Sequence, residues 1–206
     1  MENVAIEGIG DLNVVTELFR QVGCVEADNC ILVVTNRDYN TVSGAGDMAT
    51  ENAADAGADL GGAVGGLVAG ALVGAINESV KEQVGAFNRS LNERQKIAFD
   101  TKHFPGYIVN VISTGIGIIP CRNSGQLIPN VKDLITDVEH FCFFPNEEIE
   151  TMALKKLPLH FSSMKLAVCF KNTGELKVDT PWQVYKKHKL VPYEEANFNK
   201  LAAKLS

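Results

Sequence analysis

The sequence has few features that mark a nucleic-acid-binding, secreted or metal-binding protein. Its formal net charge is −6, which argues against general binding to nucleic acid, because that activity needs a positive surface to meet the phosphates. The five cysteines are an odd number, widely scattered, and contain no C-x-x-C motif, so neither a disulfide framework nor a zinc ribbon is indicated. We expect reduced structural cysteines, a cytoplasmic protein and no nucleic-acid partner.

The amino terminus lacks the pattern of a secretory signal. Acidic residues occupy the stretch "MENVAIEGIGD", where a signal peptide needs lysine or arginine, and no long apolar core follows them. We therefore expect no secretory signal in this sequence.

Motifs for catalysis and cofactor binding are also scarce. The glycine-rich part has no G-K-S or G-K-T, so it is not a phosphate-binding P-loop. The "GAGDMA" stretch at 44–49 lies too far after the apolar run "ILVVT" for a dinucleotide-binding turn. His140 and Cys142 are two residues apart, but a metal site needs two more ligands at a recognisable spacing. We expect no metal, no cofactor and no enzyme activity; the alternative is a small enzyme with a pocket between a helical insert and a sheet.

What the sequence does contain is a globular composition with an uneven charge. Hydrophobic residues make up 46% and charged residues 21% of the 206 residues, which suits one large domain or a small domain carrying an insertion. The net charge is −9 over residues 1–60, −2 over 61–149 and +5 over 150–206. An acidic front and a basic back could attract each other within one fold, or the basic part could meet an acidic partner or an anionic lipid surface.

A glycine-rich stretch, "GADLGGAVGGLVAGALVGAIN", covers residues 57–77 and has no charge after position 60. On a helix its four-residue spacing forms a flat stripe that allows close approach of a neighbour; the residues of this stripe are Gly62, Gly66, Gly70 and Gly74. Because bulky residues line the other face, such a helix must be buried all round. Three readings stay open: a soluble helical hairpin packed on the rest of the protein, association with a membrane, or self-association through the stripe.

Periodicity assigns the remaining elements. A helix over 11–23 and a strand over 30–35 come first, and "ESVKEQVGAFNRSLNERQKIAFD" at 78–100 predicts one amphipathic helix. "GYIVNVISTGIGIIPC" predicts two strands around a turn, 147–157 suits a strand or a helix, and "SMKLAVCFKNTGELKVDT" predicts a hairpin whose second strand is "ELKV". The final helix has Pro192 at its first position, and its apolar stripe consists of Phe198, Leu201, Ala202 and Leu205.

The part from about residue 105 onward resembles bacterial pleckstrin-homology-like and GRAM-like domains. The resemblance rests on "YIVNVISTGIGIIP", on "PNEEIETMALKKL" followed by "MKLAVCFKNTGELKV", and on the closing helix. It implies a small antiparallel β-barrel or sheet that the last helix plugs at one end, and a lipid- or protein-binding module. We therefore predict an α+β protein with an N-terminal helix and strand (1–46) that belong to the β-domain, a glycine-rich helical insert (47–104) and a PH-like β-domain with the C-terminal helix (105–206).

Lysines in the last third are the candidate contacts for an anion or a lipid. They are Lys155, Lys156, Lys165, Lys186 and Lys187. They could line an anion-binding edge of the β-domain, or they could serve only as solubilising residues that protect strand edges. The sequence thus predicts a binding module whose partners are an anionic membrane surface or another protein, located in the cytoplasm and associated with a membrane if the lysines or the glycine stripe contact lipid.

Overall fold

The protein is an α+β structure built on one antiparallel sheet, as predicted. The computed structural model describes residues 10–24, 26–35, 86–101, 103–123, 134–156, 163–173, 178–185 and 191–205. The helices are α2 (Leu12–Gln21), α6 (Glu93–Phe99) and α7 (Glu194–Lys204), with short 3₁₀ turns at Val138–His140 and Lys171–Thr173. The strands are β1 (Ile31–Thr35), β2 (Gly106–Ile112), β3 (Gly115–Asn123), β4 (Leu134–Thr136), β5 (Cys142–Pro145), β6 (Ile149–Lys156), β7 (Ser163–Phe170) and β8 (Trp182–Tyr185).

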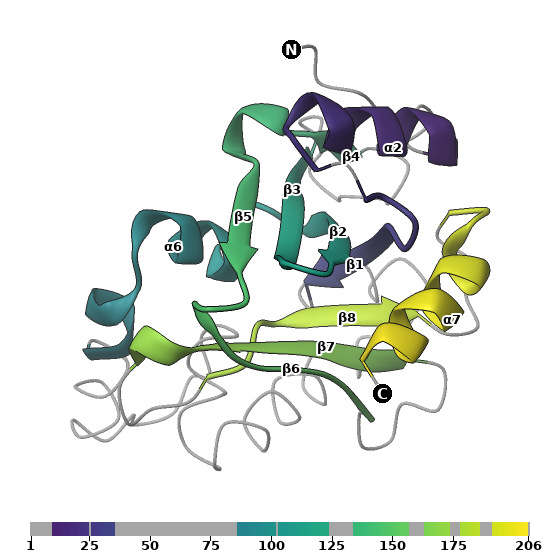
Figure 1. Cartoon of the computed structure of the whole chain (residues 1–206). Coiled ribbons are helices and arrows are strands. Elements are labelled where there is room, and N and C mark those ends of the chain that lie inside the picture. The colour runs from purple at the N-terminus through teal and green to yellow at the C-terminus, as the bar shows by residue number, and fades with distance from the viewer. Residues whose placement is uncertain are drawn as a thin grey trace, which may run out of the picture.

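Over the described residues, eight strands form an open sheet rather than a closed barrel. Their order is β4-β3-β2-β1-β8-β7-β6, and β5 pairs with β3 on the same side as β4. Strand β1 holds the two halves together, since it pairs with β2 through Leu32↔Ile108 and with β8 through Thr35↔Trp182. Figure 1 shows β1, β2, β3 and β5 in the upper half, with β6, β7 and β8 running across below them. The barrel form of the prediction therefore does not describe this sheet.

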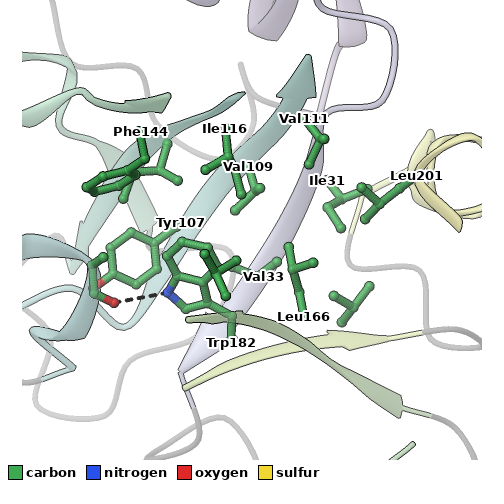
Figure 2. Packing of buried hydrophobic residues seen from close by; sticks show 14 of the residues in the cluster. Ile31, Val33, Tyr107, Val109, Val111, Ile116, Phe144, Leu166, Trp182 and Leu201 are labelled. Carbon is green, nitrogen blue, oxygen red and sulfur yellow. Dashed lines mark hydrogen bonds between the residues drawn. The ribbon is translucent and has the colours of Figure 1, made fainter. Parts of the chain in front are cut away.

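The main hydrophobic core lies between these two halves. It gathers inward-facing side chains from most strands, and Tyr107 and Trp182 are at its centre with ring centroids 5.5 Å apart. Figure 2 shows Leu201 of α7 beside Ile31, so the C-terminal helix closes one side of this core. Both Leu201 and Ile31 are fully buried.

Helix α6 contacts both halves of the sheet, at β5 and at the turn after β7. Arg94 donates to the carbonyl oxygen of Phe143 on β5 over 2.9 Å. On the other side, Gln95 and Asn172 exchange two amide hydrogen bonds of 2.7 Å each, just after β7. These contacts fix α6 to β5 and to the turn after β7, at the opposite side of the molecule from α7 (Figure 1).

Helix α2 covers the outer face of β1, β2 and β3, and it matches the prediction. Asp11 caps its first turn by accepting from the amide of Asn13, which satisfies a backbone donor that the helix leaves free. Val15 and Phe19 point into a second core under the helix. The chain then turns at Gly23, whose φ of +91° is the left-handed conformation that glycine adopts without strain.

The predicted continuous helix over 78–100 is wrong in one respect. Residues 86–90 are helical, the helix stops at 91–92, and α6 begins after Asn92. Asn92 and Gln95 form a reciprocal capping box, which starts a new helix by satisfying two orphan amides. The predicted apolar face is confirmed where it is described, because Phe87, Leu91 and Ala98 are buried.

The C-terminal part confirms the first strand of the predicted hairpin as β7, and most of the predicted second strand lies outside the described residues. Residues 149–156, left as strand or helix, form strand β6. Strand β7 pairs with β6 on one side and with β8 on the other, the latter through Lys165↔Gln183 and Leu166↔Trp182. Of the predicted second strand "ELKV", residues 175–177 lie outside the described residues, and Val178 is not in a strand. Helix α7 begins at Glu194 with Tyr193 as its N-cap, so Pro192 precedes the helix instead of occupying its first position.

Much of the predicted insert lies outside the described residues. This applies to residues 47–85 and therefore to Gly62, Gly66, Gly70 and Gly74. Among the helices that are described, none is both long enough and apolar enough to cross a membrane.

Candidate functional site

The structure brings three of the five predicted lysines together at one end of the β6–β7 pair. Lys155 lies directly opposite Lys165 in the strand register, so their side chains share one face of the sheet, whereas Lys156 lies opposite Met164 and its side chain points to the other face. Lys156 and Lys155 are exposed, whereas only 10% of the Lys165 side chain is accessible. Lys186 and Lys187 follow directly after β8 and lie outside the described residues.

Two like charges facing each other on neighbouring strands repel, so this arrangement needs a counter-charge. Asp179 supplies it. Its Oδ2 accepts a hydrogen bond from Nζ of Lys155 and lies 4.0 Å from Nζ of Lys165. Because only 8% of the Asp179 side chain is exposed, the carboxylate compensates the nearly buried ammonium of Lys165, which would otherwise be very costly to remove from water.

Thr180 fixes the position of Asp179 beside β7. The Thr180 amide donates to the carbonyl oxygen of Val168 over 3.0 Å. Its hydroxyl donates to the carbonyl oxygen of Leu166 over 2.9 Å and accepts from the Val168 amide over 3.2 Å. Three bonds from one residue hold the segment before β8 against β7, so the neighbouring carboxylate is held beside the lysine pair.

Sequence reasoning missed Asp179. The only local signal was that a lysine-rich strand pair requires an acid nearby, and that signal does not say which acid. The counted charge of the described group is +2, from Lys155, Lys156 and Lys165 against Asp179. We call these four residues the lysine group. Within it, Asp179 pairs with Lys155 and the nearly buried Lys165, and Lys155 and Lys156 are exposed.

Two histidines, His103 and His140, make local contacts with aspartates. Nδ1 of His140 and Nε of Arg122 each lie 2.8 Å from Oδ2 of the fully buried Asp137. Nδ1 of His103 lies 2.7 Å from Oδ2 of Asp100. Each histidine is three residues from its aspartate, so each pair fixes the turn that contains it. Over the residues that the structure describes, no group of three or more histidines, cysteines and acids is placed to hold a metal.

The cysteines are buried thiols that are poor nucleophiles near neutral pH. Burial raises the pKa of Cys30 and of Cys121 to about 12 and that of Cys142 to about 11. Since the reactive species is the thiolate, these side chains remain protonated at neutral pH. They behave as small core residues, which agrees with the burial of all five cysteines.

Comparisons of the chain with protein-family models, with curated proteins and with solved structures found no match. The lysine group is therefore characterised by its own geometry and charge.

Proposed function

We propose that this protein is a non-catalytic binding module that engages an anionic surface through the lysines at the end of β6 and the start of β7. The observation that carries the proposal is the pairing of Lys155 with Lys165 across the two strands, next to the exposed Lys156. The proposed ligand is the phosphate-bearing face of an anionic membrane. An acidic surface on a protein partner is the alternative that the experiment below separates.

The resemblance to bacterial pleckstrin-homology-like and GRAM-like domains supports a binding role. It implies an antiparallel β-domain with a helix at one end. Residues 105–206 supply seven of the described antiparallel strands, and α7 packs through Leu201 beside Ile31 of β1, a strand from outside this part of the chain. The open sheet departs from a closed barrel. We propose a PH-like relationship for this part of the chain, with binding rather than catalysis as its implication.

Electrostatics set the expected strength of the contact. A lysine close to an anionic membrane contributes about 1 kcal/mol, and this attraction falls when salt shortens the screening length. The exposed Lys156 and the half-exposed Lys155 are placed to contribute. Asp179 offsets part of the charge, so we expect weak, salt-sensitive association.

Vesicle flotation tests the proposal. Wild-type protein is mixed with phosphatidylserine-containing vesicles or with phosphatidylcholine vesicles, at low and at high salt. We expect binding only to the anionic vesicles at low salt. Lys156→Glu should weaken it more than ten-fold, because the reversal changes the local charge by two and each charge is worth about 1 kcal/mol.

The matched control is Lys96→Glu. Lys96 is likewise a lysine that is not buried, with 51% of its side chain exposed, and it forms an ion pair with Glu93. It lies on α6, at the opposite side of the molecule from the end of β6 and from α7 (Figure 1). It should leave vesicle binding almost unchanged. Equal binding to both vesicle types would contradict a role for the lysines, and the absence of binding to either would direct the search to acidic protein partners.

The second part of the proposal concerns the glycine stripe, for which we propose a role in close helix packing or membrane association. Gly66 and Gly70 are proposed to let a helix approach a neighbouring element closely, in this protein, in a second copy or in a membrane. Replacing both by leucine improves helix propensity by under about 2 kcal/mol, whereas overpacking costs about 1–3 kcal/mol at each site. The double variant should therefore be less stable or lose its assembly or membrane contact, and a more stable protein with unchanged assembly and location would contradict close packing.

A further inference from the structure

We infer that Asp179 is the specificity-determining residue of the lysine group: it occupies the place that a small anion would take between Lys155 and Lys165. The site then accepts only an extended anionic surface that reaches Lys155 and Lys156 from outside. This inference rests on the proposed function for the identity of the ligand, but its central claim, that Asp179 acts as an internal anion, is tested separately.

The geometry is that of a bound oxyanion. A single carboxylate oxygen of Asp179 is bonded to Nζ of Lys155 and lies 4.0 Å from Nζ of Lys165, so it lies near ammonium groups from two adjacent strands. A phosphate or carboxylate oxygen from solution would bind most strongly at the same point. That point is already filled by a group of the same charge.

The internal carboxylate is also held firmly. Thr180 ties the adjacent backbone to β7 through Val168 and Leu166, and the Asp179 side chain is almost inaccessible. A small anion would have to displace Asp179 from this position or bind next to it. Like-charge repulsion of this kind is a means of rejecting the wrong ligand.

An anionic surface meets a different part of the group. The side chain of Lys155 is 45% exposed although it contacts Asp179, and Lys156, the next residue of the edge strand β6, is exposed on the opposite face of the sheet. A membrane or other extended array of anions that approaches the β6 edge of the sheet can contact both lysines at once, one from each face, without entering the space that Asp179 fills. A small anion contacts only one of these lysines. The lysine group therefore binds an extended anionic surface in preference to a small anion.

Two substitutions separate the charge of Asp179 from its volume. Asp179→Ala removes both and leaves a space between the ammonium groups, whereas Asp179→Asn removes the charge but keeps the space filled. The probe is formate, whose carboxylate matches the group removed, and the readout is the thermal unfolding midpoint at constant ionic strength with chloride as the reference salt.

We expect formate to raise the midpoint of Asp179→Ala in a dose-dependent way, because a ligand that binds only the folded state stabilises it. Wild-type protein and Asp179→Asn should show no difference between formate and chloride. A purely structural ion pair would make Asp179→Ala less stable without making it respond to formate. Equal responses in wild type and Asp179→Ala would overturn the inference, as would no response in Asp179→Ala.

Anionic-vesicle binding by Asp179→Asn provides the second measurement and decides the matter if Asp179→Ala does not fold. Loss of one negative charge should tighten binding about five-fold at low salt. Unchanged or weaker binding by a folded Asp179→Asn, while Lys156→Glu still weakens binding, would overturn the inference and leave the proposed function standing. Absence of vesicle binding in wild type would instead refute the membrane ligand, and the formate experiment would still decide whether Asp179 is an internal anion.

Discussion

The indole nitrogen of Trp182 on β8 donates a hydrogen bond to the carbonyl oxygen of Ala98 on α6, over 3.2 Å (Figure 2). Ala98 belongs to the last turn of its helix, where carbonyl oxygens have no partner within the helix. Tyr107 satisfies the preceding carbonyl in the same way, since its hydroxyl donates to Ile97 over 2.8 Å. Two core aromatic residues therefore fasten the end of α6 to the sheet.

Trp182→Phe should lower the free energy of unfolding by about 2–4 kcal/mol. The substitution leaves a buried carbonyl oxygen without its donor, which costs about 1–3 kcal/mol, and it removes part of a fully buried ring. Urea denaturation measures the difference. Tyr107→Phe is the milder comparison, because the Ile97 carbonyl also accepts from the Asp100 amide; equal, negligible effects for both variants would contradict this account of how α6 is held.

The two leucines in the last turns of α7 should differ in their contribution. Leu201 is fully buried in the main core, whereas Leu205 is only partly buried at its edge. Leu201→Ala should cost about 2–5 kcal/mol, and Leu205→Ala clearly less, because less apolar area is lost from contact. Denaturation midpoints of both variants measure this. An unchanged midpoint for Leu201→Ala would mean that the helix does not close the core.

Elements with strong local signals were predictable from the sequence. The apolar face of α2, its end at Gly23 and the β2–β3 hairpin depend on neighbouring residues, and each was predicted within a few positions. Periodicity is a property of a short segment. It needs no knowledge of the rest of the chain.

The parts that were missed depend on distant or competing contacts. The capping box of Asn92 and Gln95 interrupts an apolar pattern that otherwise continues, so the periodic signal concealed the break. Strand β8 is recognisable only through its pairing with β1 and β7. Asp179 is separated from Lys155 by 24 residues, and no local spacing identifies it as the counter-charge of the lysine pair.

Two glycines, Gly115 and Gly23, are required for different reasons. At Gly115 a side chain would overlap a neighbouring strand, and at Gly23 the backbone is left-handed. A Cβ on Gly115 would overlap the carbonyl oxygen of Phe144 on the paired strand β5. A Cβ on Gly23 would meet open space, but its φ is +91°.

Gly115→Ala should therefore be the more damaging substitution, because the β3–β5 pairing must shift to relieve the overlap; we expect a loss of about 2 kcal/mol or more, in the upper part of the range for overpacking. Gly23→Ala should cost about 1 kcal/mol, the strain of a left-handed conformation. Thermal and urea denaturation of both variants measure the order, and a larger loss for Gly23→Ala would contradict the close approach at Gly115.

Buried thiols give the folded state a sensitivity to alkaline pH. The ordinary thiol pKa is 9.0, and burial raises it to about 12 for Cys30 and Cys121 in the folded protein. Below pH 9 both states keep the proton and the thiols cause no pH dependence. Above pH 9 the unfolded chain releases its protons while the folded chain holds them, so the free energy of unfolding falls until the folded pKa is reached.

Each such thiol should remove about 1.4 kcal/mol of stability per pH unit between pH 9 and pH 12. We expect the urea midpoint of the wild-type protein to fall steeply over this range. Cys121→Ala removes one of the titrating groups, so its stability should fall with a slope that is smaller by about 1.4 kcal/mol per pH unit, even though its stability at pH 7 is lower. Lysines and tyrosines titrate in both proteins, and the difference between the two slopes isolates the thiol. If the free energy of unfolding fell equally steeply with pH in wild type and Cys121→Ala, Cys121 would ionise as readily in the folded protein as in the unfolded chain. Burial would then not raise the pKa of this thiol.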